Sequence, residues 1–373
     1  MKRRGFLSAP VALAAAAAAT PAADSPAVDS RIFAYGDGIP LGPAGYANLM
    51  QQLAPQIAPD NYSLGGVVEE VEAKMAVVLG KEAAVWLPTG TLANHLAVRL
   101  LAQPGRRVLV PEQSHLYNDS GDCAQTLSGL TLVPLAEGRS TYRLEEAEAA
   151  ANRAQLGRVI TPVSALVIET PVRRQAGQQF DFEAMRNLSA WAQKRKIGRH
   201  LDGARLFIEC AYTQRPVQDY TALFDTVYVS MYKYFNAPSG AILAGPKALM
   251  ADLYHTRRMF GGGLPGAWPF AAVSLHYLNG FSERMRRAAE TGEKVIASLE
   301  RNGNFVVERI PGGTNIFRLK PIGANAPAYQ GRLEQAGISA HTPSGDTFTL
   351  QVNETWNRAS AAEIVARFER GIS

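Results

Sequence analysis

The segment from Arg199 to Gly245 constrains this chain most, because it places an acid and a lysine at the ends of two successive apolar runs. The first run ends at Asp202, and the second, which starts at Asp225, leads to Lys233 just before an Asn-Ala-Pro turn. Short runs rich in Val, Ile and Tyr, separated by helix-length segments, predict parallel strands of an α/β sheet. Because ligands bind at the carboxyl ends of such strands, we expect Asp202 and Lys233 to face one crevice.

A carboxylate and a lysine that converge in such a crevice suit a pyridoxal phosphate site. The lysine amine can bind the cofactor covalently, and the carboxylate can keep the pyridine nitrogen protonated so that the ring accepts electrons. For Asp202 and Lys233 taken alone, the alternatives are a structural ion pair or two unrelated surface residues.

A candidate phosphate site lies earlier in the chain. A predicted strand over residues 83–88 leads into Thr89-Gly90-Thr91, where a helix begins. Such a turn presents free backbone N–H groups, two hydroxyls and the positive end of a helix dipole, which together can hold a phosphate. Ordinary N-capping of the helix by threonine is the alternative.

These motifs resemble a known family. The HLDGARLF segment at 200–207, the lysine before the Asn-Ala-Pro turn and the Arg-Met-Phe-Gly-Gly-Gly segment at 258–263 are similar to low-specificity threonine aldolases of the β-eliminating lyase group. The resemblance implies a fold-type I pyridoxal phosphate enzyme of the α/β class. Such a protein has a mostly parallel sheet flanked by helices in a large domain, and a smaller C-terminal α+β domain.

The resemblance also assigns roles to single residues. Lys233, His115 and Asp202 would be catalytic, with His115 stacked on the pyridine ring. Arg205 would contact the cofactor's phenolic oxygen or a substrate carboxylate, which suits its planar guanidinium group. The cofactor-binding residues are then expected to be Thr89, Gly90, Thr91, His115, Asp202, Arg205, Ser230 and Lys233, with no metal ligand.

The residues expected on the substrate side depart from the family pattern. A serine in the N-terminal arm, a histidine, an arginine after the glycine loop and an arginine on the last strand are replaced by Gly36, Pro171, Pro265 and Thr349. This loss leaves Arg205, with Arg318 as a further candidate, to bind a substrate carboxylate. The pattern therefore favours cofactor binding over any particular substrate.

The resemblance implies retro-aldol cleavage of a β-hydroxy amino acid to glycine and an aldehyde. The altered substrate side keeps other possibilities open, namely β-elimination or transamination of another amino acid, or a non-catalytic protein that retains the fold. A homodimer or homotetramer is expected, because sites in this fold type are usually built by two subunits.

Composition agrees with a globular enzyme. The chain has 373 residues, of which 47% are hydrophobic and 19% charged, enough for one large and one small domain. Its two cysteines exclude a disulfide framework and a Cys-rich metal site. No basic patch interleaved with aromatic residues occurs, so a nucleic acid partner is not expected.

The first residues predict an export signal. Lys2, Arg3 and Arg4 precede an Ala-rich apolar stretch, a pattern similar to twin-arginine signals, so a periplasmic location is expected. That stretch is too short to span a membrane stably, and an uncleaved tail is the alternative. The predicted divisions are the signal at 1–23, an N-terminal arm at 24–60, a large cofactor-binding domain at 61–280 and a small domain at 281–373.

Overall fold

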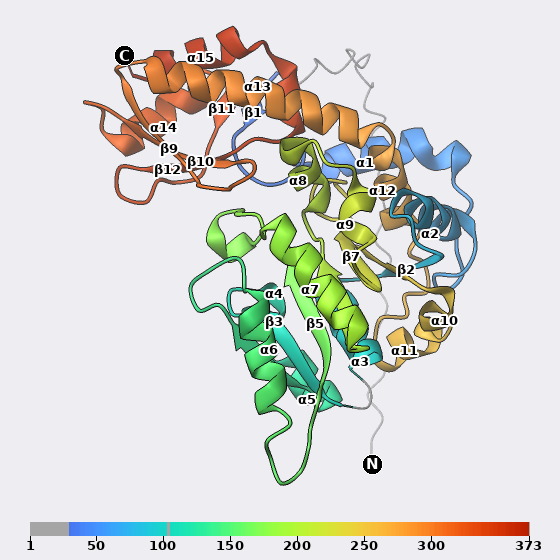
Figure 1. Cartoon of the computed structure of the whole chain (residues 1–373). Helices are drawn as coiled ribbons and strands as arrows, with labels where there is room; N and C mark the ends of the chain where they lie inside the picture. The colour runs from blue at the N-terminus through green and yellow to red at the C-terminus, as the bar shows by residue number, and fades with distance from the viewer. Residues whose placement is uncertain (1–29, 103–104, 373) are drawn as a thin grey trace, which may run out of the picture. The chain divides into compact units, whose positions relative to one another are not determined.

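A computed structural model describes residues 30–102 and 105–372, so the predicted export signal lies outside the described residues. The chain from Arg31 onward forms one compact unit, drawn in Figure 1. It contains a seven-stranded and a three-stranded sheet together with a two-stranded pair. None of the described helices combines the length and apolarity that a membrane span requires.

The seven-stranded sheet has the strand order β2-β8-β7-β6-β5-β3-β4. Strand β8 pairs antiparallel with β2 and β7 and all other pairs are parallel, so the predicted α/β class with a mostly parallel sheet is confirmed. The strands are β2 (Ala83–Leu87), β3 (Arg107–Pro111), β4 (Thr131–Leu135), β5 (Val163–Glu169), β6 (Gly198–Asp202), β7 (Thr226–Ser230) and β8 (Ala241–Gly245).

Helices cover both faces of this sheet, because successive side chains of a strand point to opposite faces and the inner strands are apolar on both. Ala165 and Val167 of β5 share a core with Val98 of α3 (Gly90–Leu101). Leu166 and Ile168 pack instead in the core that contains α6 (Leu144–Arg153) and α7 (Phe182–Lys194). Every second residue of these strands therefore points toward α3.

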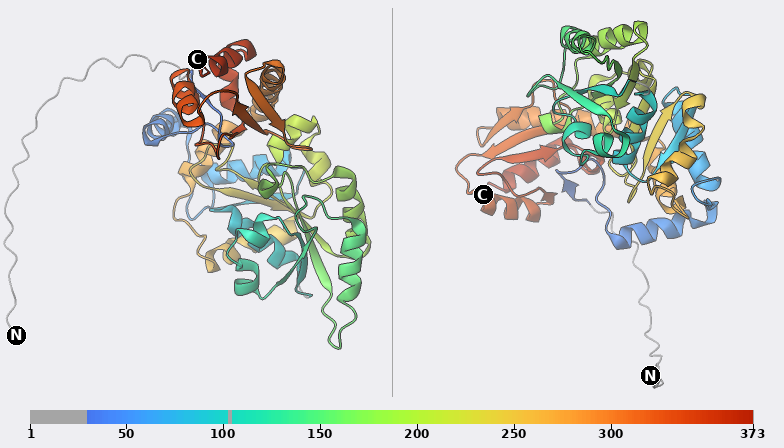
Figure 2. Two further views of the ribbon diagram at one scale, coloured as in Figure 1. Left: turned by 90° about the vertical axis from the view of Figure 1, so that its left-hand side faces the viewer. Right: turned by 90° about the horizontal axis from the view of Figure 1, so that it is seen from below.

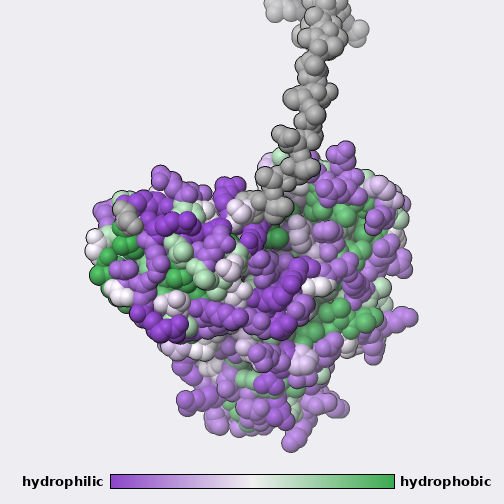
Figure 3. Space-filling model, turned by 90° about the horizontal axis from the view of Figure 1, so that it is seen from above, coloured by the Kyte–Doolittle hydropathy of each residue, from purple (hydrophilic) through white to green (hydrophobic). Residues whose placement is uncertain are grey.

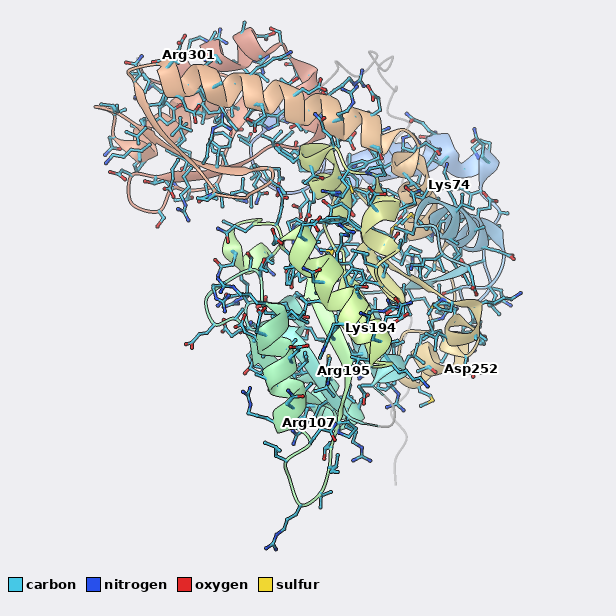
Figure 4. All side chains as sticks on the ribbon, in the orientation of Figure 1. Lys74, Arg107, Lys194, Arg195, Asp252 and Arg301 are labelled. Carbon is cyan, nitrogen blue, oxygen red and sulfur yellow. The ribbon has the colours of Figure 1, made fainter. Side chains whose placement is uncertain are left out.

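The remaining helices of this larger lobe surround the sheet. In Figure 4, Arg107 at the start of β3 lies toward the lower end of the lobe. The parallel strands start at that end, so their carboxyl ends lie at the other. The bounds are α1 (Pro43–Leu53), η1 (Ala54–Gln56), α2 (Gly66–Val78), α4 (His115–Asn118), α5 (Cys123–Ser128), η2 (Arg173–Gln175), α8 (Leu206–Thr213), α9 (Val217–Thr221), α10 (Lys247–Met250), α11 (Leu253–Met259) and α12 (Trp268–Leu278).

A smaller lobe follows, built on an antiparallel sheet of order β12-β10-β9 with helices against it, and Figure 2 shows it from two sides. The bounds are α13 (Phe281–Arg301), β9 (Phe305–Arg309), β10 (Ile316–Pro321), α14 (Ala326–Gln335), β11 (Ile338–Ser339), β12 (Phe348–Gln351), η3 (Glu354–Arg358) and α15 (Ala361–Arg370). On the face drawn in Figure 3, polar side chains surround scattered hydrophobic ones.

Helix α13 belongs to both lobes. Its first turns place Phe281 and Met285 in the core of the large lobe, whereas Ala288, Val295 and Leu299 lie in the core of the small lobe. This helix joins the two cores without a linker. The predicted domain boundary at 280/281 therefore stays a prediction.

The N-terminal arm is held by the small lobe. Strand β1 (Ile32–Phe33) pairs in parallel with β11, some three hundred residues away in sequence. The buried Asn353 Nδ2 donates to the backbone oxygens of Phe33, Tyr35 and Gly36, at 2.9, 3.0 and 3.2 Å. Because Asp37 follows directly, Asn353 sets where the arm enters the large lobe.

We predict that Asn353→Ala destabilises the protein, because it leaves the buried oxygens of the arm without their donor. The expected loss is about 1–3 kcal/mol of unfolding free energy, measured by urea denaturation. Asn357→Ala is the matched control, because Asn357 is exposed and donates to a single backbone oxygen, that of Arg284. Equal stability of the two variants would contradict this role of Asn353.

Candidate active site

Three polar side chains meet where neighbouring strands of the large sheet end. Glu169 of β5 pairs in register with Asp202 of β6, and Asp202 pairs with Tyr228 of β7. Paired residues of adjacent strands point to the same face. All three are buried and lie on the α3 face of the sheet, at the carboxyl ends of the parallel strands.

These ends line a pocket of about 470 Å³. Four of the residues predicted from sequence line it together, namely His115, Asp202, Arg205 and Lys233. The N-terminal arm closes one side of the pocket with residues 35–41. Gly38 permits this approach, because a Cβ there would overlap Asn236, whose Oδ1 accepts from Ile39 N at 2.7 Å.

The Asp202 carboxylate is hydrogen-bonded through both oxygens. Oδ2 accepts from Asn94 Nδ2 at 2.5 Å, and Oδ1 accepts from the backbone N–H of Ala204 at 3.1 Å. A buried carboxylate needs such partners, since an unpaired charge would be costly at this depth. These bonds fix the orientation of the carboxylate that faces the pocket.

Asn94 connects Asp202 to a histidine. Because the Asn94 amide group donates to Asp202, its Oδ1 must accept from His200 Nε2, which lies 2.9 Å away. His200 Nδ1 then accepts from the Thr226 hydroxyl at 2.9 Å. Burial lowers the pKa of His200 to about 4, against an opposing effect of Asp202, so the ring is neutral at pH 7 with its proton on Nε2.

Lys233 lies beside two hydroxyls. Its Nζ is 3.2 Å from Ser230 Oγ and 3.0 Å from the phenol oxygen of Tyr232. Burial alone would raise the pKa of Tyr232, but the charge and hydrogen bond of Lys233 outweigh it and lower that pKa. Ser230 is thus next to the lysine amine, although it does not itself line the pocket.

Glu169 anchors the backbone of His115 at the carboxyl ends of the strands. Its Oε2 accepts from the backbone N–H of His115 at 2.6 Å, and its Oε1 accepts from that of Arg173 at 3.1 Å. Burial, reinforced by the nearby Asp202, raises the pKa of Glu169 to about 8. The side chain therefore holds a proton at neutral pH in a pocket that also contains Asp202.

The predicted phosphate turn does not line this pocket. The Thr89 hydroxyl accepts from the backbone N–H of Leu92 at 3.2 Å, which is ordinary helix capping. Gly90 packs against the phenol of Tyr228, which itself lines the pocket, and a Cβ on Gly90 would overlap that phenol. The phosphate-binding role of Thr89, Gly90 and Thr91 stays a prediction.

Arg205 is already paired. Its Nε lies 2.9 and 3.0 Å from the two carboxylate oxygens of Asp37, and its second terminal nitrogen lies 2.9 Å from Asp37 Oδ2. Arg318, the other candidate for a carboxylate, donates instead to the exposed Glu308 at 2.6 Å. It does not line the pocket, and its role in carboxylate binding stays a prediction.

Reasoning from sequence missed Asn94, Glu169, Asp37 and Arg173. Glu169 ends an apolar strand just as Asp202 does, so the criterion that selected Asp202 would also have found it. Asn94 and Asp37 come from a helix and from the arm, and only the fold brings them to the strand ends.

The residues present fit pyridoxal phosphate. A lysine amine and a hydrogen-bonded carboxylate face one pocket, and the positive end of helix α3 lies behind Tyr228. Among the residues that the structure describes, no cluster of three or more metal-ligating side chains occurs. Lys233 would bind the cofactor covalently. Asp202 would contact its ring nitrogen, and His115 would stack on the face of its ring. This combination defines a fold-type I pyridoxal phosphate enzyme.

Comparisons with known proteins agree. The sequence pattern of the family described as beta-eliminating lyase matches residues 50–320, and the chain belongs to this family. An aldolase of Penicillium aethiopicum is 31% identical over 63% of this chain and 62% of its own length. An alanine racemase of Cochliobolus carbonum is 30% identical over 52% of this chain and 49% of its own. The matching segment thus spans less than two thirds of these curated relatives.

The solved structures extend the match over nearly the whole chain. A protein of Listeria monocytogenes EGD-E assigned as an L-allo-threonine aldolase superimposes with a TM-score of 0.76. It is 26% identical, and the superposition covers 91% of this chain and 95% of that one. The small lobe is therefore shared with a solved relative, and pyridoxal phosphate is the cofactor of the family.

We predict that Asn94→Leu destabilises the protein, because it leaves Asp202 Oδ2 and His200 Nε2 without partners in the core. Each unsatisfied buried group costs about 1–3 kcal/mol of unfolding free energy, to be measured by urea denaturation of the cofactor-free protein. Asn187→Leu on α7 is the control, because Asn187 is exposed. A loss no larger than that of the control would show that Asn94 does not satisfy these groups.

We also predict a pH-dependent effect of Glu169→Gln. The folded protein keeps a proton on Glu169 up to about pH 8, whereas the unfolded chain releases it near the ordinary value of 4.5. The folded state is thus stabilised by this group at low pH and loses that contribution as pH rises from about 4.5 to about 8. The stability advantage of the wild type over Glu169→Gln should shrink across this window in denaturation curves. An advantage independent of pH would contradict the raised pKa.

Proposed function

We propose that this protein cleaves a β-hydroxy amino acid by a retro-aldol reaction, giving glycine and an aldehyde. The observation that carries the proposal is that Lys233, Asp202 and His115 face one pocket in a chain of the β-eliminating lyase family. The aldolase relative and the L-allo-threonine aldolase structure support this reaction.

The cofactor would supply an electron sink for the charge left when the Cα–Cβ bond breaks. The chain's own residues prepare that step. Asp202, held by Asn94 and the Ala204 N–H, keeps its carboxylate aimed into the pocket to hold a proton on the ring nitrogen. Lys233, which would hold the cofactor, lies in the pocket as a group that could also move a proton.

His115 is the candidate base for the β-hydroxyl proton. Its Nδ1 lies 3.3 Å from Ser120 Oγ, and its Nε2 has no partner within the described residues. Its main-chain N–H donates to Glu169, so the backbone that carries the ring is held at the pocket wall. Pro171, which stands where the family pattern has a histidine, carries no group that could take this proton.

A second candidate function is exchange of the Cα proton, as in racemisation. The alanine racemase relative favours it. The same pocket places Lys233 beside Tyr232, whose lowered pKa makes the phenol a better proton donor. Glycine release and inversion at Cα are separate measurements, so one substrate panel distinguishes the two reactions.

We predict that cofactor-loaded protein releases glycine from threonine or phenylserine, and that Lys233→Ala does not. The variant should also lose the visible absorption of covalently bound cofactor, and its turnover should fall at least about a hundredfold. Lys247→Ala is the control, because Lys247 is exposed on α10.

The proposal fails if the loaded wild-type protein releases no glycine from any β-hydroxy amino acid. Ammonia together with a keto acid would identify β-elimination, and inversion of alanine without glycine release would identify racemisation. Conversion of the cofactor to its amine form would identify transamination.

We also propose export to the periplasm and assembly as a homo-oligomer. The first supporting feature is the twin-arginine-like pattern of the leader. The second is the exposure of Tyr62, Leu64 and Met259 next to the glycine loop at 261–263, since apolar side chains clustered at a surface favour association. Cell fractionation and light scattering test the two points separately.

A further inference from the structure

The last strand, on which the family resemblance places a carboxylate-binding arginine, offers no partner for a substrate carboxylate. The last strand, β12, carries Thr349 opposite Arg318, and neither lines the pocket. The cationic side chains that do line it are those of Arg173, Arg205 and Lys233. Because Lys233 is needed for the cofactor, the choice lies between the two arginines.

Arg205 has little capacity left for a second carboxylate. Three contacts of 2.9–3.0 Å join its guanidinium to Asp37, and the exposed fractions of the two side chains are only 19% and 11%. Turning Arg205 toward a substrate would leave Asp37 buried without its counter-charge, which is unfavourable. The pair therefore behaves as one neutral unit that joins the arm to the large lobe.

Arg173 is in the opposite situation. Its side chain is 59% exposed, and its ion pair with Asp119 spans 3.9 Å. Asp119 is held more closely by Arg174, at 3.1 Å. Within the described residues the Arg173 guanidinium makes no hydrogen bond, so its five N–H donors remain available to a ligand.

The backbone of Arg173 is nevertheless held in a fixed position at the pocket. Its backbone N–H donates to Glu169 Oε1 at 3.1 Å, which ties the first residue of η2 to the sheet edge next to Asp202. The long side chain can therefore move while its origin stays fixed at the pocket wall. A planar guanidinium with free donors is suited to bidentate binding of a carboxylate.

We propose that Arg173 binds the carboxylate of the substrate and so restricts the site to amino acids rather than simple amines. This inference rests on the proposed function, because it places the substrate in the same pocket. Arg205 then binds Asp37 of the arm and faces the cofactor. Arg173 supplies the positive charge that the family places on the last strand.

The test uses cofactor-loaded protein and measures glycine binding through the change in cofactor absorption. Arg173→Gln should weaken glycine binding by about tenfold to a hundredfold, the range expected for losing charge-assisted hydrogen bonds. Binding of glycinamide, which lacks the carboxylate, should change by less than about twofold. Arg173→Lys should recover part of the affinity, because it restores the charge without the planar group.

Arg174→Gln is the matched control. It removes the same charge from the adjacent residue, and Arg174 binds Asp119 without lining the pocket. This variant should bind glycine like the wild type. Equal melting temperatures and cofactor content for the two glutamine variants would show that both are folded and loaded.

Two results would overturn the inference. One is unchanged glycine binding in Arg173→Gln, and the other is equal weakening for glycine and glycinamide, which would indicate a structural role. If the wild-type protein binds neither compound, the proposed function itself fails, so the two failures can be told apart. Weakening limited to β-hydroxyaspartate would place Arg173 at a side-chain carboxylate instead of the α-carboxylate.

Discussion

The Asp202 carboxylate is buried at the end of β6, and the site around it depends on how that charge is satisfied. Asn94 from α3 and the Ala204 N–H donate hydrogen bonds to its two oxygens, and a hydrogen bond from His200 orients Asn94. Because His200 and Asp202 are two residues apart on one strand, they share the α3 face of the sheet. The alternation of a single strand thus brings the carboxylate and the histidine that supports it to one helix.

The same register assembles the rest of the pocket wall. Glu169, Asp202 and Tyr228 are neighbours because β5, β6 and β7 pair in parallel without a shift at their ends. Glu169 then fixes the backbone of both His115 and Arg173. Burial, reinforced by the nearby Asp202, raises the pKa of Glu169, so Glu169 stays protonated near neutral pH.

The N-terminal arm makes the pocket dependent on the small lobe. Asn353 holds the backbone of the arm, and Asp37 at its end neutralises Arg205. This pairing engages the arginine for which the family resemblance left two roles open, contact with the cofactor's phenolic oxygen or with a substrate carboxylate. Arg173, whose guanidinium is mostly exposed, becomes the cation with free donors in the pocket. The lining of the pocket therefore depends on contacts between residues that are far apart in sequence.

The amino-acid sequence by itself determined the α/β class, the strands that end at Asp202 and near Lys233, and the site of His115. Apolar runs with polar residues at their ends are local patterns, and a parallel sheet brings such ends to one edge. Only the tertiary structure decided that β8 runs antiparallel, that Asn94 reaches Asp202 and that Asp37 binds Arg205. Those outcomes depend on which distant groups are packed within hydrogen-bonding distance, and local patterns carry no information about that distance.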